Sequence, residues 1–157
     1  MPPLEAGQPA PAFSLPRDGG GTLDLADYAG RIVVVFFYPK DDTSGCTKEA
    51  IGFTERMADF EAAGAAVIGI SKDSVKSHDK FKAKHELAMP LLSDEDGSVC
   101  DQFGVWVEKS MYGRKYMGIE RSTFLIDGTG TLRQVWRKVK VPGHVDAVLA
   151  AVREISG

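Results

Sequence analysis

The sequence contains very few cysteines. Only Cys46 and Cys100 occur among its 157 residues, and no C-x-x-C motif is present. Two cysteines cannot form a disulfide framework, and without C-x-x-C spacing we expect neither a zinc ribbon nor a thioredoxin-type dithiol. Any thiol chemistry must therefore start from one of these two residues.

Long apolar runs are absent as well. Runs such as residues 32–38 are far shorter than the roughly 20 residues that a membrane-spanning helix needs, so no membrane partner is expected. Residues 1–5 have neither the basic n-region nor the apolar h-region of a secretory signal. The predicted location is the reducing cytoplasm.

No large excess of charge is present. The net charge is −3 and the isoelectric point is near 5.6, which argues against nucleic acid as a main partner. A local basic cluster at residues 133–140 alternates with apolar residues, as in a strand with one solvated face. With no repeats, linkers or low-complexity segments, residues 1–157 are predicted to form a single domain with its own core.

The sequence also lacks a clear pattern for binding a metal or a phosphate. His78, His85 and His144 are scattered, and two of them belong to a lysine-rich helical segment, so no metal site is predicted. Residues 127–130 read Asp-Gly-Thr-Gly, which is typical of a hairpin turn, and no helix or lysine follows as a phosphate-binding loop requires. We expect no cofactor.

The most informative stretch is the loop at residues 39–46, which follows a buried strand. Residues 32–38 are apolar, β-branched or aromatic without helical gaps, which is typical of a strand buried on both faces. From Cys46 to Ala63 the apolar positions recur every three or four residues, which predicts a helix. Cys46 should therefore lie in the first turn of that helix.

This position gives Cys46 a chemical role to test. Free backbone N–H groups and the positive end of the helix dipole favour the thiolate form of a cysteine in a first turn. The alternative is a buried structural cysteine, since free cysteines are commonly buried. Loops that follow a buried strand are where α/β proteins usually carry their chemistry, which favours the reactive interpretation.

The remaining pattern predicts an α/β fold with a mixed sheet. Strands alternating with helices long enough for crossovers imply parallel pairing, and two hairpins add antiparallel strands. The expected elements are a hairpin over 12–15 and 22–25, strands at 66–71 and 90–94, helices at 75–86 and 98–103, a short extended piece at 104–108, a loop at 109–118, a hairpin over 121–127 and 131–139, and a closing helix at 142–155.

Four separated residues then show a resemblance to a known family. The segment P-x-x-x-T-x-x-C, present as Pro39, Thr43 and Cys46, together with Arg121 in the downstream segment 120–127, resembles the peroxiredoxins. Within them the chain is most similar to the bacterioferritin comigratory protein group, also called peroxiredoxin Q. The resemblance covers nearly the whole chain and implies a thioredoxin-like fold, with a central mixed sheet flanked by helices.

The resemblance implies that Cys46 is the peroxidatic cysteine. Its thiolate would attack a peroxide oxygen, expel water or an alcohol, and become sulfenic acid. Thr43 would accept a hydrogen bond from the peroxide or donate one to the thiolate, unless it is simply a helix cap. Pro39 would shield the sulfur with an apolar wall, unless it only ends the strand.

Two charged residues complete the expected site. Arg121 would favour the thiolate and stabilise charge on the departing oxygen, the alternative being an ordinary surface arginine. Glu49, one turn after Cys46, could orient that arginine, although a glutamate in a first turn also complements the helix dipole. Glu49 is therefore a supporting residue only.

The chain departs from the pattern of the family it resembles in the resolving cysteine. Many members carry it five residues after the first cysteine, where Ile51 stands, and others carry it within 77–82, where no cysteine occurs. Cys100 is the remaining candidate, either as a resolver or as a packed, inert thiol. A disulfide requires Cα atoms within about 7 Å, so a resolving role would need local unfolding or a partner chain.

The predicted function is a cofactor-free, thiol-dependent peroxidase acting on hydrogen peroxide and organic hydroperoxides. An outside thiol such as thioredoxin, glutaredoxin or glutathione would regenerate Cys46, and the resemblance implies a monomer. The alternative from another class is a thioredoxin-fold binding or chaperone-like module without turnover. A thiol-disulfide oxidoreductase is disfavoured by the missing second cysteine. The polar partners expected around one exposed thiol favour the peroxidase.

Overall fold

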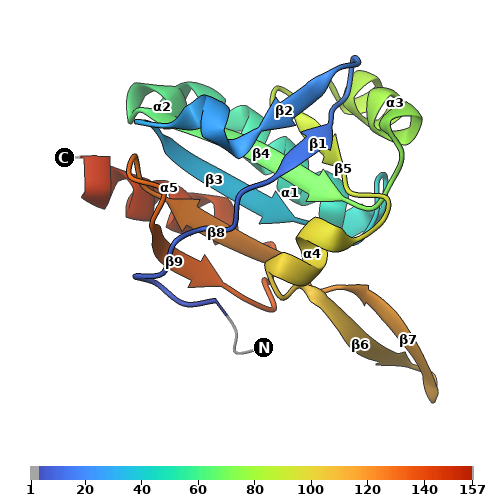
Figure 1. Cartoon of the computed structure of the whole chain (residues 1–157). Helices are drawn as coiled ribbons and strands as arrows, with labels where there is room; N and C mark the ends of the chain where they lie inside the picture. Colours follow the sequence, from blue (N-terminus) through green and yellow to red (C-terminus); the bar gives the residue numbers. More distant parts are fainter. Residues whose placement is uncertain (1–3, 157) are drawn as a thin grey trace.

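A five-stranded mixed sheet forms the centre of the protein (Figure 1). The computed structural model describes residues 4–156, so the first three residues of the N-terminal stretch discussed above lie outside it. Strand β3 is the middle strand, pairing parallel with β4 and antiparallel with β8. Across the sheet the strands are β5 (Leu91–Ser93), β4 (Ala65–Ser71), β3 (Ile32–Phe37), β8 (Ser122–Ile126) and β9 (Leu132–Trp136).

The middle strand is buried on both faces, as its unbroken apolar sequence predicts. Val34 and Phe36 belong to the core on one face, whereas Val35 and Phe37 belong to the core on the other. The first face is covered by α1 (Ser44–Glu55), α2 (Met57–Ala62), α3 (Val75–His85) and α5 (His144–Ser156). The second is covered by β1 (Ser14–Pro16), β2 (Thr22–Asp24), the 3-10 helix η1 (Leu25–Tyr28) and α4 (Ser98–Gln102).

The helix after the central strand differs from the single helix predicted. It begins at Ser44, which places Cys46 in its first turn as expected, but it is interrupted at Arg56. Arg56 has φ −101° and ψ 7°, outside the α-helical region, so α1 ends and α2 begins there. Neither proline nor glycine stands at this position, so the sequence gives no local signal for the break.

Among the described helices, none has the length and apolarity needed to cross a membrane.

The prediction of a loop at 109–118 is wrong, because most of this segment is a β-hairpin. Strand β6 (Trp106–Met111) pairs antiparallel with β7 (Arg114–Ile119). Tyr112 and Gly113 join the strands, and both have positive φ, 54° and 77°, as the tight two-residue hairpin turns require. Tyrosine is an unusual first residue for such a turn, which concealed the hairpin in the sequence. The hairpin extends away from the rest of the fold (Figure 1).

Candidate active site

The register of two antiparallel strands brings Arg121 to the loop of Cys46. Strand β3 ends at Phe37, and the chain then forms the loop that leads into α1. Phe37 pairs with Ser122, the first residue of β8. Arg121 immediately precedes Ser122, so it lies beside the end of β3 where the Cys46 loop begins. The predicted proximity of Arg121 and Cys46 thus follows from strand pairing rather than from sequence distance.

Arg121 bridges Cys46 and Glu49. Its Nη2 donates a hydrogen bond to Cys46 Sγ at 3.2 Å, and its Nη1 donates to Glu49 Oε1 at 2.8 Å. This geometry uses the planar fork of the guanidinium, which a lysine could not reproduce. Gly45 leaves the room for it, since a Cβ at this position would lie 3.1 Å from Arg121 Nη2. The structure therefore joins these three predicted residues directly.

The surroundings of Arg121 keep its guanidinium positively charged. Burial alone would lower the pKa of its guanidinium, but the negative charges of Glu49 and Cys46 outweigh burial and raise the pKa overall. Arg121 is thus a fixed cation in contact with the sulfur. Together with the N-terminus of α1, it places positive charge beside the sulfur of Cys46.

The expectation of an exposed thiol at Cys46 is wrong. Cys46 is only 1% exposed, because its side chain belongs to the core between the sheet and helices α1 and α5. The hydrogen bond from Arg121 gives the buried sulfur a charged donor. The sulfur is thus both shielded from bulk water and electrostatically supported.

Thr43 and Pro39 lie at the loop but do not bond to the sulfur. Thr43 occupies the N-cap position of α1, yet its hydroxyl makes no capping bond and instead donates to the carbonyl of Lys40 at 2.9 Å. Its hydroxyl proton is therefore not directed at Cys46, whereas its oxygen lone pairs remain available to accept a hydrogen bond. Pro39 is half-buried and lies two residues after the end of the central strand.

His144 is a site residue that the sequence did not reveal. Its Nε2 lies 4.0 Å from Glu49 Oε2 and 2.8 Å from Thr123 Oγ1. Glu49 Oε2 is the one buried side-chain nitrogen or oxygen without a hydrogen-bond partner in residues 4–156. The rings of Phe53 and Trp136 stand edge-on to the imidazole and close the space around it. The helical spacing at 142–155 predicted the helix but carries no information about what its first residue contacts.

Burial shifts the proton equilibria of Glu49 and His144 in opposite directions. Desolvation raises the pKa of Glu49 to about 7, although Arg121 opposes the change. Desolvation, helped by repulsion from Arg121, lowers the pKa of His144 to about 4. At neutral pH the imidazole is therefore neutral, and the carboxyl next to Arg121 is close to its titration midpoint.

These shifts predict how stability responds to pH. Glu49 keeps its proton longer when folded, so its contribution is present below pH 4.5 and is lost as pH rises through 7. His144 behaves oppositely: its contribution is present above pH 6.5 and is lost as pH falls through 4. Compared with wild type, Glu49→Gln should therefore gain relative stability, by roughly 3 kcal/mol, between pH 4.5 and 7.5.

Urea unfolding at a series of pH values checks this expectation. His144→Gln should show the opposite trend, losing stability relative to wild type as pH rises from 4 to 6.5. A conservative change at an exposed carboxylate, Glu61→Gln, serves as the control and should run parallel to wild type. If the Glu49→Gln curve also ran parallel to wild type, the carboxyl would not titrate as described.

A second buried polar network anchors the loop before Cys46. Asp41 accepts hydrogen bonds from Tyr38 Oη at 2.6 Å, from Ser77 Oγ at 2.8 Å and from His78 Nδ1 at 2.8 Å. His78 Nε2 lies 2.9 Å from the carbonyl of Leu92, so the ring stands between two acceptors. Burial lowers the pKa of His78, but the hydrogen bond and charge of Asp41 outweigh burial and raise it. The network ties the loop to α3.

Asp41, His78 and Asp73 form the one group within residues 4–156 whose spacing suits a metal ion, their ligand atoms lying within 4.8 Å of one another. Asp73 Oδ2 accepts from the backbone N–H of Asp41 at 2.8 Å and from Ser71 Oγ at 2.7 Å. The lone pairs of this group are thus used in hydrogen bonds within the protein. We assign no metal to it.

Cys100 lies on the other side of the sheet from Cys46. It belongs to the second core, with Val35 and Phe37, and is 0% exposed. Its backbone N–H donates to Asp94 Oδ2 at 2.7 Å. Burial, together with the carboxylate of Asp94, raises the pKa of the Cys100 thiol. A raised pKa disfavours the thiolate needed for disulfide exchange.

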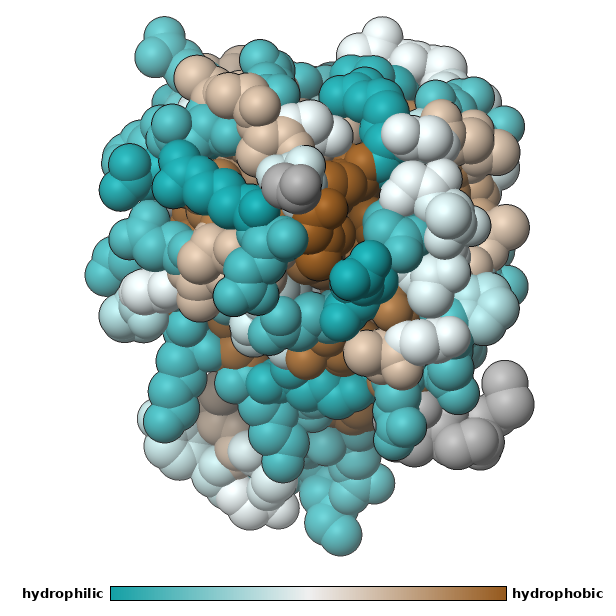
Figure 2. Space-filling view, turned by 90° about the vertical axis from the view of Figure 1, so that its left-hand side faces the viewer, coloured by the Kyte–Doolittle hydropathy of each residue, from teal (hydrophilic) through white to brown (hydrophobic). Residues whose placement is uncertain are grey.

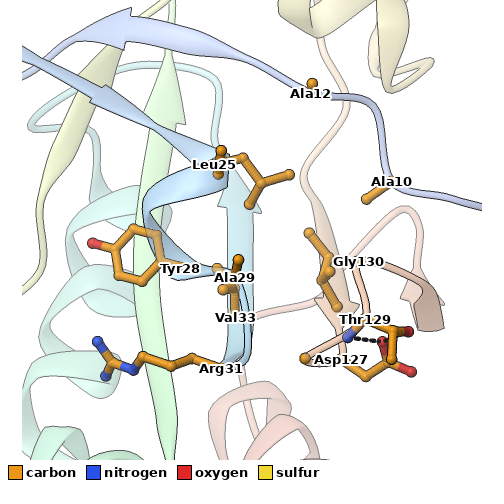
Figure 3. Close-up of a pocket in the computed structure, with 13 residues that line it drawn as sticks. Ala10, Ala12, Leu25, Tyr28, Ala29, Arg31, Val33, Asp127, Thr129 and Gly130 are labelled. Atoms are coloured by element: carbon orange, nitrogen blue, oxygen red, sulfur yellow. Dashed lines mark hydrogen bonds between the residues drawn. The ribbon is translucent and has the colours of Figure 1, made fainter.

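A cavity of about 210 Å³ lies at the opposite end of β3 from Cys46. Figure 2 shows the end of the molecule at which β3 begins, where hydrophobic residues are visible between hydrophilic ones. Leu25 and Ala29 approach the cavity from one side and the 127–130 turn from the other (Figure 3). Asp127 is already engaged by the backbone and hydroxyl of Thr129. No cysteine lines the cavity, so it is not part of the thiol site.

Comparison with known proteins agrees with this geometry. Residues 6–135 match the AhpC/TSA family. The chain is 52% identical to the peroxiredoxin Bcp of Xanthomonas campestris, over 92% of each chain. It is 47% identical to the peroxiredoxin Bcp of Bacillus subtilis, over 98% of each chain.

Solved structures give the same result. A structure of the Xanthomonas campestris bacterioferritin comigratory protein, described for its alkyl peroxide reduction activity, superimposes with a TM-score of 0.88 at 49% identity, covering 92% of each chain. A cysteine-to-serine mutant of Xylella fastidiosa PrxQ gives 0.94 at 40% identity over the full length of both chains. These matches confirm the thioredoxin-like fold. The chain therefore belongs to the AhpC/TSA family and, within it, to the peroxiredoxins of the bacterioferritin comigratory protein group.

Proposed function

We propose that this peroxiredoxin reduces hydrogen peroxide and organic hydroperoxides with the thiolate of Cys46. The observation that carries the proposal is the 3.2 Å hydrogen bond from Arg121 Nη2 to Cys46 Sγ in the first turn of α1. The sulfur attacks one peroxide oxygen, the O–O bond breaks, and the second oxygen leaves as water or an alcohol once it has a proton. Cys46 is left as sulfenic acid.

The neighbouring residues would each serve this step. Arg121 would stabilise the thiolate and then the charge that develops on the departing oxygen. Glu49 would hold the guanidinium in place through its 2.8 Å bond. Thr43 would accept a hydrogen bond from the bound peroxide through its free lone pairs, and Pro39 would form an apolar wall at the loop.

Cys100 would be a structural thiol rather than a resolver. Its place in the other core supports this assignment, because a disulfide with Cys46 would require rearrangement across the sheet. The sulfenic acid would then be reduced by an outside thiol such as thioredoxin, glutaredoxin or glutathione. The first thiol forms a mixed disulfide and releases water, and a second thiol releases Cys46 as a thiol.

The finer assignments follow from the same considerations. The chain would act as one domain and as a monomer, and its two free cysteines suit a reducing cytoplasm. It would require neither a metal nor a cofactor. The alternative of a binding or chaperone-like module without turnover is not favoured, since relatives matched over nearly their whole length are peroxiredoxins.

Intact mass after one equivalent of peroxide tests the proposal. With a sulfenic-acid trap and no reductant present, we expect one trap adduct per chain, mapped to Cys46, and an unmodified Cys100. A loss of two hydrogens with a Cys46–Cys100 peptide would instead make Cys100 the resolver. An unchanged mass would contradict the peroxidase function.

A further inference from the structure

The exposed large hydrophobic side chains of the protein are concentrated on one hairpin. In the part of the chain that the structure describes, they are Met111, Tyr112, Tyr116 and Met117, with exposed fractions of 55%, 98%, 44% and 48%. All four lie on β6–β7, which extends from the body of the fold (Figure 1). Clustered exposed apolar side chains on a protruding element commonly mark a contact surface.

The pairing register divides the hairpin into two faces. Lys109 pairs with Tyr116 and Met111 with Arg114, so these four side chains share one face. Met117 pairs with Glu108 and lies on the opposite face. We call the first group, Lys109, Met111, Arg114 and Tyr116, the site-side face.

The hairpin that carries the site-side face adjoins the thiol site along the chain. Strand β7 leads through Glu120 directly into Arg121. A Cβ added at Gly118 would meet both Lys109 and Tyr116, so these two side chains pack over the same part of β7. On the opposite face, the ammonium of Lys72 lies 4.0 Å from the centre of the Trp106 ring. Part of that face is therefore already covered by Lys72.

The hairpin also carries a charge opposite to that of the whole chain. Lys109, Arg114 and Lys115 oppose the single acid Glu108, whereas the whole chain has a net charge of −3. An apolar surface with a basic edge is complementary to an apolar surface with an acidic edge. This complementarity indicates a protein partner rather than a small thiol, which would not need so large an apolar surface.

We propose that the site-side face, with Tyr112 at its tip, docks a protein thiol reductant whose reactive cysteine lies in an apolar, acid-edged surface. The inference rests on the proposed function, in which an outside thiol must reach the buried Cys46. The partner's thiolate attacks the sulfenic sulfur, forming a mixed disulfide and releasing water after protonation. Its second thiol then displaces Cys46, so the partner leaves oxidised to a disulfide and Cys46 returns as a thiol.

The test compares two methionines on opposite faces of one hairpin. Turnover is measured in three separate assays. In the first, thioredoxin is kept reduced by thioredoxin reductase and NADPH; in the second, glutaredoxin is kept reduced by glutathione, glutathione reductase and NADPH. The third assay uses dithiothreitol alone as the reductant. Met111→Ser combined with Tyr116→Ser should raise the KM for the protein reductant at least about tenfold, while dithiothreitol-supported turnover is retained. Met117 is similarly exposed but lies on the other face, so Met117→Ser should change neither the KM for the protein reductant nor the dithiothreitol-supported turnover. Arg114→Glu should weaken the protein-supported reaction in a salt-dependent way.

Several outcomes would overturn the docking proposal. One is a loss of dithiothreitol-supported turnover as large as the loss of protein-supported turnover. Another is an equal rise in the KM for the protein reductant in the Met111 and Met117 variants. A third is turnover that small thiols support but neither thioredoxin nor glutaredoxin does. A wild-type dimer in sedimentation that the Met111→Ser/Tyr116→Ser variant disperses would make the face a self-interface instead. Failure of the proposed function is distinguishable, because Cys46 would then not be oxidised by peroxide in the absence of any reductant.

Discussion

Peroxide consumption is expected to disappear when Cys46 is replaced by serine. Serine keeps nearly the same volume in the core, but its hydroxyl remains protonated at neutral pH where the Arg121-bonded sulfur is a nucleophile. The loss should be complete relative to uncatalysed oxidation of the reductant. The measurement is peroxide consumption with a thiol reductant, together with single-turnover oxidation of the protein.

Cys100 provides the matched control for this experiment. Cys100→Ala removes the other thiol, and because it leaves a small cavity in the second core we expect it to cost about 1 kcal/mol in the free energy of unfolding. Oxidation of Cys46 and turnover with an outside thiol should be retained. Turnover by Cys46→Ser, or loss of turnover in Cys100→Ala with folding intact, would contradict the assigned roles.

The second large effect is expected from Arg121→Ala. This change removes the hydrogen bond to Cys46 Sγ and the cation beside the departing oxygen. Losses from removing one such electrostatic contact are typically about 10²- to 10³-fold in rate, and we expect the oxidation rate of Cys46 to fall within that range. Stopped-flow measurement of Cys46 oxidation by peroxide provides the value.

Two further variants separate electrostatics from folding. Arg121→Lys keeps the charge but not the fork that spans Cys46 and Glu49, so its rate should lie between those of wild type and the alanine variant. Arg133→Ala removes an exposed arginine on β9 and should leave the rate unchanged. The cost of Arg121→Ala in stability should shrink below neutral pH, where the unpaired Glu49 is protonated. An unaltered oxidation rate in Arg121→Ala would remove this residue from the mechanism.

The pattern along the sequence predicted the framework of the fold well. The apolar run at 32–38 predicted the buried central strand, and the three-to-four spacing after it placed Cys46 in a helical first turn. The glycine turn at 128–130 predicted the β8–β9 hairpin. These features succeed because they depend on burial periodicity and turn chemistry, both of which are local properties of the chain.

The hairpin at 106–119 shows where local patterns are insufficient. The turn residues Tyr112 and Gly113 both adopt positive φ, but only the glycine signals this in the sequence. The strands also lack a clean alternation, because Met111, Tyr116 and Met117 remain exposed rather than packing on a core. The element most relevant to a partner was therefore the one predicted as a loop.

The surroundings of the thiol depended on contacts between distant segments. Glu49 was expected only as a possible support for Arg121, yet its carboxyl is fully buried between Arg121 and His144. His144 is far from Glu49 in the sequence, and no spacing rule connects the two. The same is true of Asp41 and His78, whose buried contact at 2.8 Å holds the loop before Cys46 against α3.

By itself, the sequence determined the order of strands and helices apart from the β6–β7 hairpin and the break between α1 and α2, the position of Cys46 at a helix start, and the resemblance that pointed to peroxide chemistry. Only the tertiary structure decided that Cys46 is buried, that Arg121 contacts its sulfur, and that Cys100 lies in the opposite core. The physical reason is that secondary structure follows from neighbouring residues, whereas burial and charge pairing depend on which segments the sheet register brings together.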